Sequence, residues 1–160
     1  MRLAAVLVLA LAAGTPARAA DFTLGLGYDD LSGEGSGAAT VGLQVTSEPI
    51  WQLGAIGFGL GVAGEADTAG DLWAGAGLTA GLPLGDAWRV GGSVMAGFYA
   101  FGDGGDDLGS DLEFRTRLGV SREIRPPWRL GLAIEHKSNG GIGEINPGIE
   151  TIFVTLTRPF

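Results

Sequence analysis

The feature that most constrains this chain is a period-two alternation of apolar residues with small or polar ones, which recurs from residue 22 to the last residue. Successive side chains of a β-strand point to opposite faces, so this alternation indicates strands that each have one apolar face. Clusters of Gly, Asp, Ser and Pro separate eight segments of this kind. We expect strands over residues 22–29, 38–47, 51–63, 72–84, 88–101, 112–124, 128–138 and 150–160.

The third segment is less regular than the others. Its apolar residues change parity partway along, from Trp51 and Leu53 to Ile56 and Phe58. A β-bulge inserts one extra residue into a strand and so turns the residues that follow to the other face. We therefore expect a single bulged strand over 51–63.

Strands with one apolar face form either a soluble β-sandwich, in which that face is inside, or an outer-membrane barrel, in which it faces lipid. The barrel is favoured because the expected strands are even in number and mostly 8 to 14 residues long, and a tilted spanning strand needs ~9–11 residues. The chain also ends on an aromatic residue, Phe160, which resembles outer-membrane barrel proteins generally.

The other parity of the strands mixes glycine with charged residues that can pair inside a narrow lumen, namely Glu113, Arg115, Arg117, Arg129, Glu135 and Lys137. The interior of an eight-stranded barrel is just filled by side chains, so a water-filled porin is not expected. The sequence therefore predicts an all-β fold, an eight-stranded antiparallel transmembrane β-barrel with a filled interior.

The first residues have the pattern of a secretory signal peptide. Arg2 precedes an apolar run over 3–13, and small residues occupy Ala17 and Ala19. We expect cleavage after Ala19, with Ala20 as the alternative, so that 1–19 is the signal and 20–160 is the barrel domain. The run is too short for a spanning helix, which needs ~20 apolar residues.

Composition excludes several classes of function. The net charge of −8 argues against nucleic acid as a partner. The absence of cysteine excludes a disulfide scaffold and a thiolate metal site. A hydrophobic content of 46% excludes a disordered chain.

The links between the expected strands differ in length. Three are short, at 47–50, 85–87 and 125–127, and four are longer, at 30–37, 64–71, 102–111 and 139–149. Bacterial barrels place short turns in the periplasm and long loops outside. The longer links hold 10 of the 18 acidic residues, which are Asp30, Glu34, Glu65, Asp67, Asp71, Asp103, Asp106, Asp107, Asp111 and Glu144. We interpret these acids as solvated loop residues, and contact with lipopolysaccharide through bridging cations is the alternative.

The last two expected strands bring the only histidine of the chain, His136, near a serine and a carboxylate. His136 and Ser138 lie two residues apart, so their side chains share the apolar, lipid-facing row of one strand. If Trp128 and Phe160 are level at the other end of the hairpin, Ser138 lies opposite Glu150, and Glu150 is diagonal to His136.

Serine, histidine and a carboxylate within reach of one another form the arrangement for acyl transfer. The imidazole takes the serine proton, and the carboxylate orients the imidazole and stabilises its cation. Candidate donors for the oxyanion are Asn146 and the loop N–H groups near Asn139 and Gly140. The alternative is that a histidine near a barrel rim is an ordinary interfacial residue, but three aligned polar groups on a lipid face are costly.

The motif His136-x-Ser138-Asn139, followed by Asn146-x-Gly148-x-Glu150, covers roughly the last 25 residues. It resembles the outer-membrane lipid A 3-O-deacylase (PagL-like) family. The resemblance implies that Ser138 is the nucleophile, His136 the general base and Glu150 the third member of a triad. It also implies that Asn146 is the oxyanion-hole asparagine.

By the same resemblance, the protein is an outer-membrane ester hydrolase that removes the ester-linked 3-O-acyl chain of lipid A and needs no metal or other cofactor. We expect lipid A as its substrate and an active site that faces the outer leaflet, and we leave a homodimer open. Two alternatives remain. One is a non-enzymatic structural or adhesive small outer-membrane barrel, and the other is an outer-membrane phospholipase.

Overall fold

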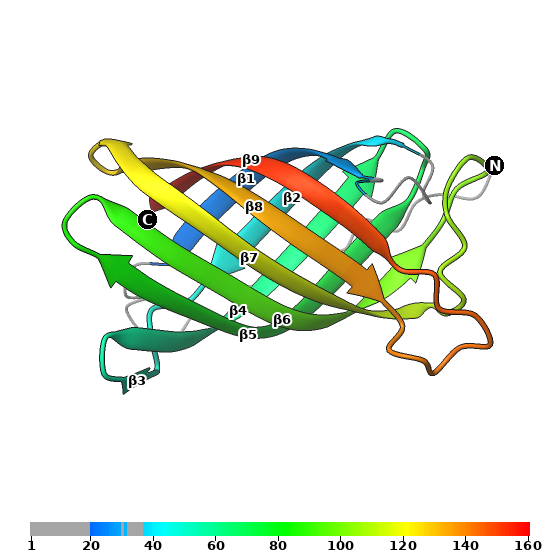
Figure 1. Cartoon of the computed structure of the whole chain (residues 1–160), viewed down its shortest axis with the longest axis horizontal. Helices are drawn as coiled ribbons and strands as arrows, with labels where there is room; N and C mark the ends of the chain where they lie inside the picture. Colours follow the sequence, from blue (N-terminus) through cyan, green and yellow to red (C-terminus); the bar gives the residue numbers. More distant parts are fainter. Residues whose placement is uncertain (1–19, 30, 32–36) are drawn as a thin grey trace.

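The computed structural model describes residues 20–29, 31 and 37–160, which form an antiparallel β-barrel (Figure 1). Its eight barrel strands are β1 (Asp21–Asp29), β2 (Ala39–Thr46), β4 (Ile56–Asp67), β5 (Leu72–Leu84), β6 (Trp88–Ala100), β7 (Leu112–Arg125), β8 (Trp128–Ser138) and β9 (Ile149–Pro159). The barrel closes because β1 pairs with β9 and β2 pairs with β4. The predicted eight-stranded antiparallel barrel is confirmed, and the predicted signal peptide lies outside the described residues.

Apolar side chains cover the outside of the barrel. On β8, Leu130, Leu132 and Ile134 are exposed, whereas the alternate residues Ala133 and Glu135 are buried. An apolar surface of this extent is costly in water and stable in a bilayer. The barrel therefore has the lipid-facing surface that the alternation predicts. In the described part of the chain, no helix is long and apolar enough to cross a membrane.

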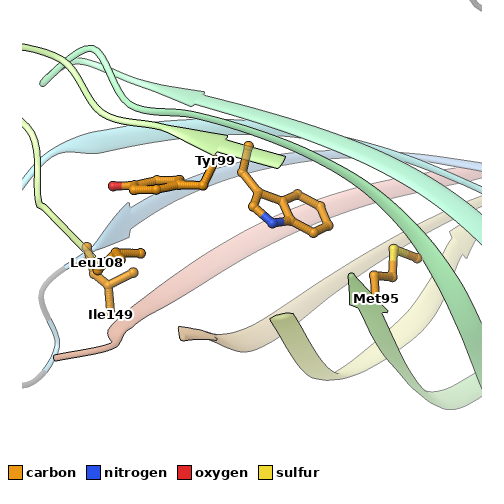
Figure 2. Close-up of a cluster of buried hydrophobic side chains, with 5 residues drawn as sticks. Met95, Tyr99, Leu108 and Ile149 are labelled. Atoms are coloured by element: carbon orange, nitrogen blue, oxygen red, sulfur yellow. The ribbon is translucent and has the colours of Figure 1, made fainter. Parts of the chain in front are cut away.

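The two ends of the barrel differ. The links after β4, β6 and β8 lie at one end, here called the long-loop end, and the turns after β3, β5 and β7 lie at the other, here called the short-turn end (Figure 1). A hydrophobic cluster fills the interior toward the long-loop end (Figure 2), and it consists of Trp73, Met95, Tyr99, Leu108 and Ile149. Leu108 belongs to the link between β6 and β7, so this link folds into the barrel mouth.

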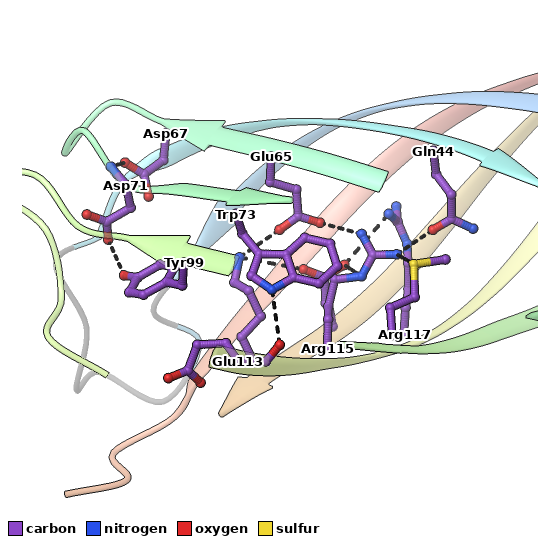
Figure 3. A network of polar contacts seen from close by, with 12 residues as sticks. Gln44, Glu65, Asp67, Asp71, Trp73, Tyr99, Glu113, Arg115 and Arg117 are labelled. Carbon is purple, nitrogen blue, oxygen red and sulfur yellow. Dashed lines mark hydrogen bonds and ion pairs between the residues drawn. The ribbon is translucent and has the colours of Figure 1, made fainter. Parts of the chain in front are cut away.

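Five charged side chains form a network inside the barrel, here called the lumen network (Figure 3). Arg115 Nη1 lies 2.8 Å from Glu65 Oε1, and its Nε lies 3.5 Å from Glu135 Oε2. Lys137 Nζ lies 2.7 Å from Glu65 Oε2 and 3.6 Å from Glu135 Oε1. Arg117 Nη1 lies 3.7 Å from Glu135 Oε2. Each charge of the lumen network therefore has an opposite charge beside it, which offsets the cost of burial.

The lumen network confirms the predicted pairing of the inward charges, with two differences. Arg129 pairs outside the network, with Asp21, at 2.9 Å. Glu113 is fully buried, but among the described residues no ion pair to it occurs.

The expectation that Glu65 is a solvated loop residue is wrong. The link predicted over 64–71 is shorter, because β4 continues to Asp67. Glu65 therefore lies on a strand, points into the lumen and is neutralised by Arg115 and Lys137.

Asp71 is also buried, with 5% of its surface exposed. Its carboxylate accepts hydrogen bonds from the Tyr99 hydroxyl at 2.8 Å and from the N–H groups of Gly102 and Asp106 at 2.9 and 3.0 Å. The solvated-loop interpretation is wrong for Asp71 because this carboxylate ties the link after β6 to the barrel.

A hairpin replaces the bulged strand predicted over 51–63. The short strand β3 (Trp51–Leu53) pairs with the start of β4, and Leu53 lies opposite Ile56. The two-residue turn between them begins at Gly54, whose φ of +58° favours glycine. A two-residue turn pairs odd residues on one arm with even residues on the other, which explains the change of parity without a bulge.

The short link predicted at 47–50 is not the place where the chain reverses. The N–H groups of Ser47 and Ile50 donate to the carbonyls of Leu60 and Phe58, each at 2.8 Å. This segment therefore continues beside β4 as far as the turn after β3.

The interior is not filled along its whole height. A cavity of about 430 Å³ lies toward the short-turn end, and Arg89, Arg117 and Arg129 are among its lining residues. The prediction of a filled interior therefore holds only for the half that contains the hydrophobic cluster.

Candidate active site

The candidate site lies on the outside of the barrel, at the long-loop end of β8 and β9. His136 and Ser138 are on the outward row of β8, and Glu150 is on the outward row of β9. The side chains of His136 and Glu150 are 48% and 33% exposed, whereas Lys137 is buried on the inward row between His136 and Ser138. His136, Ser138 and Glu150 therefore lie on one outward surface of the barrel, as predicted.

His136 and Glu150 are direct cross-strand partners. The Nδ1–H of His136 donates to Glu150 Oε1 at 2.9 Å. This hydrogen bond selects the tautomer in which Nε2 is free to accept a proton. The imidazole is therefore oriented as a general base requires.

The predicted register of this hairpin is wrong by two residues. We expected Ser138 opposite Glu150, but His136 occupies that position. At the short-turn end, Trp128 is level with Arg158, whose guanidinium lies over the Trp128 ring at 5.4 Å, and Phe160 lies beyond β9. A slip of two residues leaves every side chain on its predicted face.

Ser138 is the last residue of β8, half-buried, and opposite Phe114 of β7. Its Cα is about 6.6 Å along the strand from that of His136, because a strand rises ~3.3 Å per residue. In the described part of the chain, no hydrogen bond joins Ser138 to His136, and such contacts are often loose before substrate binds.

Gly148 is a site residue to which the sequence analysis assigned no role. Its φ is +71°, and a Cβ there would lie 2.7 Å from Cε1 of His136 and 3.4 Å from Nε2. The backbone of Gly148 therefore packs against the imidazole. Its place in the motif, two residues before Glu150, was a signal for this close approach.

Asn139 organises the loop between β8 and β9. Its side chain is fully buried, and its Nδ2 group donates to the carbonyls of Leu108 at 2.7 Å and Ile145 at 2.6 Å. Its Oδ1 accepts the N–H of Gly141 at 2.8 Å, and its own N–H donates to Asn146 Oδ1 at 3.0 Å. Asn139 therefore has no donor left for an oxyanion.

The donation from Asn139 fixes the amide of Asn146. Because its Oδ1 is used as an acceptor, its Nδ2 group can serve as a donor elsewhere, and Asn146 is exposed. Within the part of the chain that the structure describes, no hydrogen bond uses this group. Gly140, at a φ of +66°, follows Asn139 and is exposed. Within the described residues no hydrogen bond uses its N–H. Two of the three predicted oxyanion groups, Asn146 and Gly140, thus keep donors available.

The link between β6 and β7 packs against the loop between β8 and β9. A Cβ on Gly109 would lie 2.3 Å from the Ile145 carbonyl, and one on Gly143 would lie 2.3 Å from the Gly109 carbonyl. The backbone of the link between β6 and β7 is therefore in close contact with the backbone of the loop that carries Asn146. This support is not predicted from the alternation of the strands, and its available signal in the sequence is Leu108, a lone large apolar residue in an acidic Gly-rich link.

A sequence model of a family described as lipid A 3-O-deacylase (PagL) matches residues 40–158. A lipid A deacylase PagL from Bordetella bronchiseptica is 38% identical over 53 residues, which are 33% of this chain. The matched segment spans 30% of that protein's length.

Two solved structures have the same fold. The outer membrane enzyme PagL superposes with a TM-score of 0.68 at 19% identity, covering 88% of this chain and 99% of that one. Neisserial surface protein A superposes with a TM-score of 0.55 at 10% identity, covering 89% and 96%.

Proposed function

Because the chain belongs to the lipid A 3-O-deacylase (PagL) family, we propose that it is an outer-membrane serine esterase that removes the 3-O-acyl chain of lipid A. The observation that carries the proposal is the hydrogen bond from His136 to Glu150 on the lipid-facing surface, with Ser138 on the same face. This arrangement can activate a hydroxyl in contact with a lipid, which a structural barrel does not need.

The proposed reaction is an acyl transfer through Ser138. Nε2 of His136 takes the Ser138 proton while Oγ attacks the ester carbonyl carbon. The oxyanion accepts hydrogen bonds from Asn146 Nδ2 and the Gly140 N–H. The intermediate then expels the sugar 3-hydroxyl group, which takes the proton from His136. Glu150 stays ionised throughout and stabilises the imidazolium.

Hydrolysis of the acyl-enzyme repeats these steps with water. His136 takes a proton from the water while its oxygen attacks the acyl carbon, and the fatty acid leaves as Ser138 regains its proton. Each oxyanion donor contributes about 3 kcal/mol to the transition state. The chain's own residues supply every group that this route uses.

We further propose that the long-loop end faces the cell exterior. Long loops lie outside in bacterial barrels, and Ser138 lies at the end of β8 where those loops begin. In that orientation the triad meets the ester groups of lipid A in the outer leaflet, so the substrate reacts without leaving the membrane.

The test is a mass spectrum of lipid A from cells that make the wild-type protein, the Ser138→Ala variant or the Ser121→Ala variant. Ser121 is on β7 and lines the cavity at the other end, so it serves as a matched control. We expect the loss of one 3-O-acyl chain with the wild type and the control, and intact lipid A with Ser138→Ala. Unchanged lipid A with a folded wild-type protein would overturn the proposal.

A further inference from the structure

The cations of this acidic protein are unevenly distributed. Of its ten Lys and Arg residues, Arg2 and Arg18 precede the described residues. Five others face the lumen, and these are Arg89, Arg115, Arg117, Arg129 and Lys137. The remaining three, Arg122, Arg125 and Arg158, are exposed at the short-turn end of β7 and β9.

These three arginines alternate with aromatic side chains across neighbouring strands. Trp88 of β6 lies opposite Arg122 of β7, whose guanidinium is 5.6 Å from the Trp88 ring. Arg125 lies opposite Trp128 of β8, and Arg158 of β9 covers the Trp128 ring at 5.4 Å. The result is two groups of cations and indole rings on the outside of β6 to β9, Arg122 with Trp88 and Arg125 and Arg158 with Trp128, here together called the basic belt.

The acids of the short-turn end do not neutralise the basic belt from the lipid side. Asp21 faces the lumen and pairs with Arg89 and Arg129. Glu48 lies in the segment that runs beside β4, a strand that pairs with none of β6 to β9. Asp86 lies in the turn after β5, and Glu123 shares the inward parity of β7. The outward surface of these strands therefore has a local positive charge.

We propose that the basic belt binds the phosphate groups of anionic phospholipids in the leaflet opposite the candidate active site. Tryptophan is enriched at the level of lipid headgroups, and arginine beside it can reach the phosphates while its stem stays in the apolar layer. A guanidinium pairs with a phosphate through two parallel N–H donors. Among residues 20–29, 31 and 37–160, this composition occurs on one side of the barrel only, so the belt orients that side toward anionic lipid.

The choice of phospholipid, rather than lipid A, rests on the proposed orientation of the barrel. With the long loops outside, the basic belt lies in the inner leaflet, at the end opposite His136 and Ser138. Lipid A phosphates in the outer leaflet cannot reach it there.

The test uses the mature protein in vesicles of equal phosphatidylethanolamine and phosphatidylglycerol, extracted gently, with the retained lipids measured by mass spectrometry. We expect the wild type to retain more phosphatidylglycerol than phosphatidylethanolamine, and the variant Arg122→Gln/Arg125→Gln/Arg158→Gln to lose this preference at least about fivefold. The matched control is Arg89→Gln/Arg129→Gln, which removes two lumen-facing charges at the same end and keeps the preference.

Three outcomes would overturn the proposal: equal retention of both lipids by the wild type, an unchanged preference in the triple variant, or displacement of phosphatidylglycerol by added lipid A. If the triple variant does not fold, the single variant Arg158→Gln is expected to show a smaller loss of the preference. Deacylation is measured with lipid A supplied to a separate portion of each protein preparation and is expected to persist in the triple variant. A failure of lipid binding is thereby distinguished from a failure of the proposed function.

Discussion

The imidazole of His136 is held from two sides. Glu150 accepts its Nδ1–H at 2.9 Å from across the hairpin, and the backbone of Gly148 packs against the other edge of the ring. Both contacts restrict the orientation of the imidazole ring, and general-base catalysis by a histidine depends on that orientation.

Replacement of Glu150 by Gln removes the negative charge and keeps the shape of the side chain. We expect kcat for lipid A deacylation to fall by about 10²- to 10⁴-fold, with KM little changed, because the imidazolium loses its counter-charge in the transition state. Steady-state kinetics of the purified protein measures this. The control Glu144→Gln, an exposed acid on the same loop, is expected to keep wild-type kinetics. Equal activity of both variants would remove Glu150 from the mechanism.

A methyl group on Gly148 is expected to displace the imidazole. The variant Gly148→Ala should lose activity while the barrel remains folded, because its Cβ would lie 2.7 Å from His136 Cε1. Gly141→Ala is the matched control, since Gly141 also has a positive φ, of +82°, but no atom lies within 4 Å of the added Cβ. Both variants carry backbone strain of about 1–2 kcal/mol, so a similar loss of activity in both would show that strain alone is responsible.

For single residues, the sequence predicts the strand face that a side chain occupies better than it predicts the hydrogen-bond partner of that side chain. The two-residue spacing of His136 and Ser138 places them on one face whatever the register. The hydrogen-bond partner of His136 depends on the hairpin register, and the alternation cannot distinguish registers that differ by two residues. The supporting role of Gly148 depends on a loop conformation that has no periodic signal.

Among the elements, the loop after β8 and the link after β6 act as one unit. Asn139 joins them, because its buried side chain donates to carbonyls in both. The fixed position of Asn146 is a consequence of this joint, since its Oδ1 is held by the Asn139 N–H.

The variant Asn139→Ala tests this joint. It leaves the carbonyls of Leu108 and Ile145 without their donor, and an unsatisfied buried group costs about 1–3 kcal/mol. We expect faster amide hydrogen exchange over 139–148 and 101–111, together with a lower kcat, while exchange in the strands is unchanged. The control Asn146→Ala should lower kcat without loosening the link at 101–111. Unchanged exchange in Asn139→Ala would show that Asn139 does not hold the two segments together.

The elements also show where alternation is ambiguous. The parity change after Leu53 is compatible with a bulge and with a two-residue hairpin, because both move the following residues to the other face. Gly54 at positive φ makes the hairpin possible. Likewise, alternation on β4 continues past Gly64 through small residues, so its true end at Asp67 is not marked by composition.

The barrel as a whole has an apolar outer surface and a charged interior. In the lumen, Glu65 and Glu135 balance much of the charge of Arg115, Arg117 and Lys137. Glu135 and Lys137 alternate with His136 and Ser138 on β8, so the same strand is anchored inside by charge and displays the candidate site outside.

Loss of one charge from the lumen network is expected to destabilise the whole barrel. The variant Glu65→Gln leaves Glu135 as the one carboxylate beside Arg115, Arg117 and Lys137 in the lumen network, and the cost of losing a buried partner is about 3–5 kcal/mol. Urea unfolding of the protein in lipid, followed by tryptophan fluorescence, measures it. The double variant Glu65→Gln/Lys137→Gln should cost less than the sum of its single variants, because the two charges are in contact. The control Asp86→Asn, in an exposed turn, should change the free energy of unfolding by less than about 0.5 kcal/mol.

Covalent labelling of Ser138 tests the proposed chemistry most directly. An alkyl fluorophosphonate reacts with a serine only where a base activates it, and its chain places it at the lipid-facing surface. After treatment of the folded protein in lipid, mass spectrometry of its peptides should find the adduct on Ser138, absent from the His136→Ala variant. A folded wild-type protein that carries no adduct, or carries it on another serine, would contradict a triad formed by Ser138, His136 and Glu150.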